Sequence, residues 1–252
     1  MMVGLKTSAG RVFRLYRQSK YLAFVVDEFR EARLLRRGNL QWLMDEAHRS
    51  RTFDFESPLE RQWHRHLLSV LDIQLGKQQW GEALEIGCSE GVFTADLACR
   101  CRSVTALDIS SVAQARAAHR CAQYANVKIG ALDLARGEIS SRYDLIFVMD
   151  VLCLISGRRT QAQIAAKLSD ALRDGGWLVF SDSRMPKSFR HRFWSFLLPT
   201  RADVCSDILE RAPGMRLAYK DVYPAGDGGI PDYSGYWDKL FALFRKSSQA
   251  RT

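Results

Sequence analysis

Ala-Leu-Glu-Ile-Gly-Cys-Ser-Glu-Gly, residues 83–91, is the most informative stretch of this chain, because an apolar run ends there in an acidic residue and a glycine-containing turn. A helix-like segment, residues 92–100, follows at once. Glycine allows a backbone to approach a ligand closely, and the first turn of a helix offers unpaired N–H groups. The sequence therefore predicts a strand, a ligand-binding loop and a helix, as in nucleotide-binding α/β folds.

The spacing of the acidic residue and the glycines indicates which cofactor the loop binds. A dinucleotide loop has the pattern G-x-G-x-x-G, whereas Glu85, Gly87, Ser89 and Gly91 form E-x-G-x-S-x-G. This pattern resembles motif I of the class I S-adenosylmethionine-dependent methyltransferases, with Ser89 in place of the middle glycine. The resemblance implies S-adenosylmethionine as cofactor and S-adenosylhomocysteine as product, and it assigns these four residues and Cys88 to the cofactor. A tight turn that binds nothing is the alternative.

A second carboxylate lies where such a fold holds the ribose. The β-rich run 103–108 ends in Asp108, about twenty residues beyond the first glycine. We predict that Asp108 accepts both ribose hydroxyls and that Ile109 lies beside the cofactor. Asp108 could instead cap the following helix, although Ser110 and Ser111 are also suitable caps.

The next run, residues 127–134, is a weaker strand that ends at Asp133. In class I methyltransferases an acidic residue followed by an apolar one at this place often contacts the adenine. The resemblance therefore assigns Asp133 and Leu134 to the adenine, with a solvated loop carboxylate as the alternative.

A central strand is predicted over residues 143–149, which are almost continuously apolar, as in a parallel strand buried on both faces. Asp150 and Val151 follow at its carboxyl end, where open α/β sheets bind ligands. A buried carboxylate requires a nearby cation or donor. The resemblance places both residues at the cofactor and Asp150 near the methyl-transfer point. The segment resembles the E-V-L-x-x-L pattern of enzymes acting on small molecules, not the (D/N)-P-P-(Y/F) box.

The remaining patterns complete the predicted architecture. Gly175-Gly176 predicts the end of a helix and the start of a fifth strand, and residues 215–223 and 239–245 predict an antiparallel pair. We expect an α/β fold with a Rossmann-like, seven-stranded, mostly parallel sheet, helices on both faces and a final antiparallel strand pair. Residues 53–252 would form the methyltransferase domain, with an insert or lid at about 184–213, after a helical extension over residues 1–52.

Composition narrows the class of protein. The chain has 252 residues and six cysteines without a C-x-x-C pair or zinc-ligand spacing, so we expect no metal site and reduced thiols. No apolar stretch is long enough for a membrane span, and we expect a cytoplasmic protein.

The net charge of +9 is uneven, with eleven Lys/Arg against five Asp/Glu in residues 1–51. Residues 6–22 resemble a basic amphipathic helix, which could pack on the domain, on a second subunit in a homodimer, or on a membrane surface. Residues 184–201 combine five Lys/Arg with aromatic residues and no acidic residue. They could form a lid over the cofactor or stack on nucleic-acid bases.

Residues 55–68 narrow the family further. Pro58, Leu59, Glu60, Arg61 and His64, followed by the cofactor loop, resemble the N-P-(F/L)-E-R-x-x-H and L-E-I-G-C-x-x-G stretches of nodulation-protein-S type methyltransferases. The likeness runs from about residue 55 to 182 and implies methylation of an amino group on a sugar or oligosaccharide.

Two residues are candidates for acid–base chemistry or for orienting the acceptor. His64 could accept a proton from the acceptor, and Asp150 lies near the methyl-transfer point. A histidine that only packs on its helix is the alternative for His64. For the whole chain, the alternatives to a small-molecule or saccharide methyltransferase are an RNA methyltransferase and a catalytically silent, methyltransferase-like binding subunit.

Overall fold

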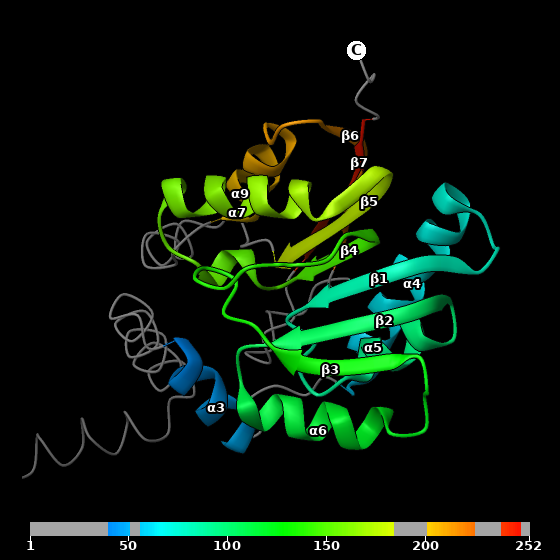
Figure 1. The fold of residues 1–252 in the computed structure, drawn as a ribbon, viewed down its shortest axis with the longest axis vertical. Coiled ribbons are helices and arrows are strands. Elements are labelled where there is room, and N and C mark those ends of the chain that lie inside the picture. Colours follow the sequence, from blue (N-terminus) through cyan, green and yellow to red (C-terminus); the bar gives the residue numbers. More distant parts are fainter. Residues whose placement is uncertain (1–39, 51–55, 184–200, 225–237, 248–252) are drawn as a thin grey trace, which may run out of the picture.

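The seven strands form one mixed sheet in the computed structural model, which describes residues 40–50, 56–183, 201–224 and 238–247 (Figure 1). The strand order is β3-β2-β1-β4-β5-β7-β6. The strands are β1 (Trp80–Ile86), β2 (Cys101–Asp108), β3 (Val127–Ala131), β4 (Tyr143–Met149), β5 (Leu172–Ser183), β6 (Met215–Tyr223) and β7 (Lys239–Lys246). Strands β1 to β5 pair in parallel, and β7 is antiparallel to both β5 and β6. The predicted sheet and its final antiparallel pair are confirmed.

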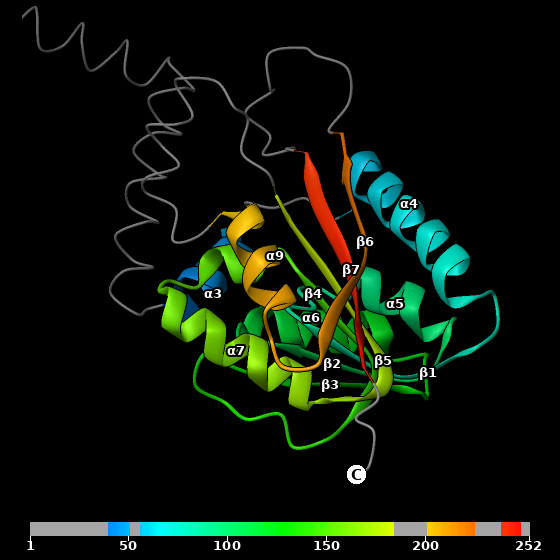
Figure 2. The same cartoon turned by 90° about the horizontal axis from the view of Figure 1, so that it is seen from above.

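Helices cover both faces of the sheet. They are α3 (Leu40–Ser50), α4 (Pro58–Leu75), α5 (Val92–Ala98), α6 (Ser111–Cys121), α7 (Arg158–Asp170) and α9 (Ala202–Glu210), with a short 3-10 turn η1 (Leu152–Leu154). Helices α4 and α5 lie on one side of the sheet and α7 and α9 on the other (Figure 2). Because the strands are buried on both faces, alternate residues enter two separate cores. Leu145 and Phe147 of β4 join the core with α4 and α5, whereas Ile146 and Val148 join the core with α7 and α9.

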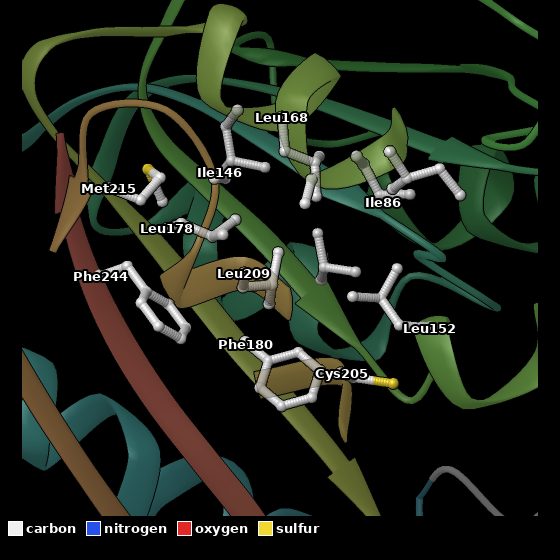
Figure 3. Packing of buried hydrophobic residues seen from close by; sticks show 14 of the residues in the cluster. Ile86, Ile146, Leu152, Leu168, Leu178, Phe180, Cys205, Leu209, Met215 and Phe244 are labelled. Carbon is white, nitrogen blue, oxygen red and sulfur yellow. The ribbon is translucent and has the colours of Figure 1, made fainter. Parts of the chain in front are cut away.

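The core beneath α7 and α9 is filled by long aliphatic and aromatic side chains (Figure 3). Leu168 of α7 and Leu209 of α9 are directed toward Leu178 and Phe180 of β5. Full burial of such a side chain contributes about 1.5–3 kcal/mol. This packing fixes β4 and β5, whose carboxyl ends carry Asp150 and Ser183.

Helix α4 begins where the sequence provides a cap. The Ser57 hydroxyl accepts a 3.2 Å hydrogen bond from the Glu60 N–H, and Pro58 occupies the first turn, where its missing N–H is not needed. Leu67 and Leu71 are fully buried against the sheet. The buried face of α4 therefore fixes where its first turn, with Glu60 and His64, can lie.

The expectation for Gly175-Gly176 was wrong. Helix α7 ends at Asp170, and both glycines lie within β5. Tyr143 pairs with Leu172 but Leu145 pairs with Trp177, so residues 173–176 form a bulge. Gly175 has φ +76°, a conformation that glycine adopts without strain. The glycines accommodate this bulge, not a helix end.

The predicted extension and insert are described only in part. Residues 40–50 form α3, which packs on α6, and residues 202–210 form α9, which packs in the core. The basic segment 6–22 and residues 184–200 lie outside the described residues. Among the helices that the structure describes, none is long and apolar enough to cross a membrane.

Candidate active site

The cofactor loop, residues 87–91, requires three residues in the left-handed backbone conformation. Gly87 and Gly91 have φ near +78°, at +77° and +78°, and Ser89 has φ +51°. A non-glycine residue in this region carries a strain of about 1–2 kcal/mol. Ser89 thus adopts the conformation suited to the glycine that motif I has at this place.

The loop after β1 meets the loop after β4 at Gly87. A Cβ atom added at Gly87 would lie 2.3 Å from Cγ2 of Val151. Only a residue without a side chain therefore allows the two loops to approach this closely. The structure brings Gly87 and Val151, two predicted cofactor residues, into contact.

Asp108, at the end of β2, links the cofactor loop to α6. Its Oδ2 atom accepts a 2.8 Å hydrogen bond from the Ser89 N–H, and its Oδ1 atom accepts one of 2.8 Å from the Ser110 N–H. The side chain of Ser110, not that of Asp108, caps α6, by accepting a 3.2 Å hydrogen bond from the Ala113 N–H. Burial raises the pKa of Asp108, and the backbone hydrogen bonds oppose that shift. Each carboxylate oxygen keeps a second lone pair for a ligand hydroxyl.

Glu85 lies beneath the loop. Its carboxyl group is buried and accepts a 2.6 Å hydrogen bond from the Thr94 hydroxyl of α5. Burial raises the pKa of Glu85 to about 8, and the nearby Asp108 carboxylate contributes in the same direction. Glu85 therefore joins β1 to α5, the two elements that flank the cofactor loop.

Two side chains of the cofactor loop, those of Cys88 and Ser89, differ in whether they can contact a ligand. The Cys88 thiol packs in the core with Phe93, and burial raises its pKa, so any ligand contact at Cys88 would come from its backbone. The Ser89 hydroxyl oxygen is buried and has no hydrogen-bond partner among the described residues. An unpartnered buried hydroxyl is unusual and fits a position that a ligand completes.

Glu90 links the cofactor loop to the neighbouring helices α3 and α6. Its carboxylate accepts a 2.5 Å hydrogen bond from Arg116 of α6 and lies 3.3 Å from Nδ1 of His48 of α3. Arg120 donates a 2.9 Å hydrogen bond to the Glu90 carbonyl. These contacts fix the loop against two helices.

The predicted adenine residues lie at the neighbouring strand end. The Leu132 N–H donates to the Asp108 carbonyl at 3.0 Å, which places the β3 loop beside Asp108. The Asp133 carboxylate is 32% exposed and accepts a 3.0 Å hydrogen bond from the Ala135 N–H, while the Leu134 side chain is buried in the core under α7. Ile109 is half-buried after β2.

Lys167 of α7 fixes this β3 loop from the other side. Its ammonium donates to the Leu134 carbonyl at 3.1 Å and to the Gly137 carbonyl. The sequence analysis did not identify Lys167, because nothing in the helix pattern marks its partner.

Asp150, the predicted residue after β4, has φ +53° and a half-exposed carboxylate with partners at both oxygens. Its Oδ1 atom accepts 2.9 Å hydrogen bonds from the N–H and the hydroxyl of Ser183, and its Oδ2 atom lies 2.6 Å from Nζ of Lys239. The prediction that a cation or donor accompanies Asp150 is confirmed. The cation comes from the start of β7.

Lys239 extends the contact to α4. Its Nζ atom lies 3.7 Å from Oε1 of Glu60, whose Oε2 atom lies 4.0 Å from Nε2 of His64. We call Asp150, Lys239, Glu60 and His64 the Lys239 cluster. Burial alone would lower the pKa of Lys239, but Asp150 and Glu60 raise it above its ordinary value. Burial raises the pKa of Glu60, against the effect of Lys239.

His64 is as deeply buried as Lys239, at 9% exposure. Burial and then the Lys239 charge lower its pKa to about 4, so the imidazole is neutral at neutral pH. Its ring lies 4.8 Å from that of Phe93, and its Nδ1 atom has no hydrogen-bond partner in the described part of the chain. The structure thus brings the two predicted residues, His64 and Asp150, into one cluster.

The sequence analysis missed two members of the Lys239 cluster. Glu60 lies four residues before His64, one helical turn away, so helix periodicity could have paired them. Lys239 is the charged first residue of a strand that continues with five apolar residues, which is a weaker signal. Among the described residues, no group of His, Cys, Asp and Glu is arranged to hold a metal ion.

The strand order and the cofactor loop are those of the class I methyltransferase fold. The family model "Nodulation protein S (NodS)" matches residues 39–199, and the chain belongs to this family. The match begins before the likeness found in the sequence and includes α3.

Relatives of known name agree with this assignment. Nodulation protein S of Rhizobium tropici is 30% identical over 128 residues, which are 51% of this chain and 52% of the relative. Nodulation protein S of Azorhizobium caulinodans is 26% identical over 167 residues, which are 66% of this chain and 75% of the relative. The chain thus spans about half the length of the first of these relatives, 52%.

Solved structures extend the comparison. The N-methyltransferase NodS from Bradyrhizobium japonicum WM9, in complex with S-adenosyl-l-homocysteine, matches with a TM-score of 0.66 and 25% identity over 81% of this chain and 99% of that one. The fold is shared by magnesium protoporphyrin IX methyltransferase from Synechocystis PCC 6803. That structure matches with a TM-score of 0.54 and 16% identity over 75% of this chain and 84% of that one.

Proposed function

We propose that this protein is an S-adenosylmethionine-dependent N-methyltransferase that acts on an amino group of a sugar or oligosaccharide. Family membership and the likeness to NodS, which was solved with S-adenosylhomocysteine, support the reaction class. The observation that carries the proposal is Asp108, whose two oxygens are held by the Ser89 and Ser110 N–H groups beside the cofactor loop. That arrangement leaves two acceptors for the vicinal hydroxyls of a ribose.

The residues of the site fit the cofactor in two further respects. The orphan hydroxyl of Ser89 offers a hydrogen bond within the loop, and Asp133 lies at the next strand end, where it can contact the adenine. When bound, S-adenosylmethionine supplies a methyl group that its sulfonium already activates. The protein therefore has mainly to position the acceptor, since proximity and orientation alone contribute about 7–11 kcal/mol in favourable cases.

The Lys239 cluster supplies the acceptor end of the site. Neutral His64 accepts a hydrogen bond from an acceptor N–H and directs the nitrogen lone pair toward the methyl group. A pKa of about 4 means that His64 does not retain a proton at neutral pH, so its role is to orient the amine. Asp150 lies within the same cluster and orients the acceptor from the β4 side. The proton released by the methylated ammonium passes to Glu60 or to water.

Calorimetric titration of S-adenosylhomocysteine tests the cofactor site first. We expect tight binding to the wild type and a loss of about a hundredfold or more in Asp108→Ala, because each hydrogen bond to a charged acceptor contributes about 1.5–3 kcal/mol. Asp144→Ala is the matched control, since Asp144 also accepts a backbone N–H, that of Glu82 at 2.7 Å, but near the opposite end of the strands. Absence of binding to the wild type would overturn the proposal.

A methyl-transfer assay with labelled cofactor tests the acceptor. We expect transfer to oligosaccharides with a free amino group and none to the same compounds after N-acetylation, which removes the nucleophilic lone pair. Transfer to RNA, with binding that weakens steeply with salt, would instead support the nucleic-acid alternative. Cofactor binding without transfer to any amine would support a binding subunit.

A further inference from the structure

Lys239 is buried at the point where three distant segments meet. It is 9% exposed at the start of β7, and its ammonium contacts Asp150 after β4 and lies near Glu60 on α4. It also donates a 3.3 Å contact to the hydroxyl of Ser183, which itself donates to Asp150. One ammonium thus connects the ends of β4, β5 and β7 with the first turn of α4.

Stability alone does not explain a buried lysine at this position. Removing the ammonium from water costs several kcal/mol, and its partners Asp150 and Glu60 stay 39% and 20% exposed, so the ion pairs offset only part of this cost. The following residues of β7, Leu240 to Phe244, are apolar and buried, so the strand packs well without charge. A buried ammonium held by two carboxylates has a fixed position, however, and that property suits a site where orientation matters.

The charges around His64 come from each polar element that packs near it. Burial lowers the pKa of His64 most, Lys239 of β7 and Arg61 of α4 lower it further, and Asp150 after β4 raises it. Glu60 of α4 lies 4.0 Å from the imidazole, and α5 contributes the uncharged ring of Phe93. Lys239 is therefore the neighbouring charge that lowers the pKa of His64 most, after burial.

We propose that Lys239 is a positioning residue of the acceptor end, which holds Asp150 and Glu60 in fixed places and thereby fixes His64 for the acceptor amine. The expected effect of Lys239 on the rate of methylation rests on the proposed methyl transfer. The expected effect of Lys239 on the position and pKa of His64 does not depend on that reaction.

Lys239→Met tests the kinetic consequence against Lys246→Met. Lys246 lies at the other end of the same strand, is also 9% exposed, and donates to the carbonyl and hydroxyl of Ser169, both at 2.7 Å. We expect Lys239→Met to lower kcat/KM about a hundredfold, mainly through kcat, because small misplacements of reacting groups have effects of this size. S-adenosylhomocysteine affinity should stay within about threefold, and Lys239→Arg should restore part of kcat. Lys246→Met should keep kcat/KM within about threefold.

An NMR titration of His64, assigned with His64→Gln, tests the link without any substrate. Lys239→Met removes a cation and leaves two carboxylates unpaired, so the pKa of His64 should rise from about 4. Glu60→Gln keeps the side-chain shape and should also lower kcat. This variant replaces Lys239→Met in the experiment if Lys239→Met does not fold. An unchanged His64 titration, with Lys239→Met kinetics equal to those of Lys246→Met, would overturn the inference. A wild type that methylates no amine would end the proposed function, while the titration would still test Lys239.

Discussion

The two ends of the site are held together in different ways. At the cofactor end, carboxylates meet backbone N–H groups close by in the chain, as when Asp108 binds Ser89 and Ser110, 19 and 2 residues away. At the acceptor end, Lys239 and Asp150 are 89 residues apart and are joined by an ion pair. A local motif can specify the first arrangement, whereas only the completed sheet assembles the second.

Gly87→Ala should have the largest effect, because Gly87 is where the two ends touch. The left-handed φ of +77° adds strain of about 1–2 kcal/mol, and a Cβ atom 2.3 Å from Val151 forces a further rearrangement of about 1–3 kcal/mol. We expect an unfolding free energy lower by about 3 kcal/mol in urea denaturation and no measurable S-adenosylhomocysteine binding.

Gly175→Ala is the matched control for this variant. Gly175 has nearly the same φ, +76°, but no atom of the described residues lies within 4 Å of the added Cβ. It should lose about 1 kcal/mol and keep cofactor affinity. If Gly87→Ala behaved like Gly175→Ala, the two loops would not depend on their close approach.

Glu85→Gln tests the second largest effect, the pH dependence of the cofactor end. Unlike the carboxylates around Lys239, Glu85 has no cation beside it in the described part of the chain, and burial raises its pKa to about 8. The folded state therefore keeps a proton that the unfolded chain loses above about pH 4.5, so stability should fall as pH rises through this window. Between pH 5 and 8 the unfolding free energy of the wild type should fall about 3 kcal/mol more than that of Glu85→Gln.

The half-exposed Glu82 on the same strand provides the control for Glu85. Glu82→Gln is measured in the same denaturant titrations at each pH, so that the effect of losing another carboxylate from β1 can be compared with that of Glu85→Gln. Parallel curves for the wild type and Glu85→Gln would show that Glu85 is ionised in the folded protein.

The comparison also explains what the sequence could predict. The strands, the final antiparallel pair and the cofactor loop follow from local patterns, and a cation or donor was expected beside Asp150 because a buried carboxylate requires one. Lys239 could not be identified as that cation, since its role depends on β7 inserting between β5 and β6. Gly175-Gly176 was misread because a helix end and a strand bulge both favour glycine. The assignments of individual residues to the cofactor stay predictions.

Lys167→Met should have a moderate effect at the adenine side of the cofactor end. Without the ammonium, the carbonyls of Leu134 and Gly137 lose their donor and the loop carrying Asp133 is less well fixed. We expect S-adenosylhomocysteine affinity to fall about tenfold by calorimetry, since a charged hydrogen bond contributes about 1.5–3 kcal/mol. Lys128→Met, on the exposed side of β3, should not change affinity. Equal affinities for both variants would mean that the loop holds its shape without Lys167.

Asp45→Ala should have the smallest effect. It tests whether the cofactor end depends on long-range contacts as the acceptor end does. Asp45 of α3 accepts a 2.7 Å hydrogen bond from the Ser110 hydroxyl, 65 residues away, so the cofactor end also has long-range contacts. Ser110 still caps α6 in the variant, so we expect a loss of about 1 kcal/mol in stability and a two- to threefold loss in S-adenosylhomocysteine affinity. Glu46→Ala, an exposed neighbour paired with Arg49, should change neither. If Asp45→Ala lost as much affinity as Asp108→Ala, the cofactor end would depend on docking of α3 as strongly as the acceptor end depends on Lys239, and the loop sequence alone would no longer account for it.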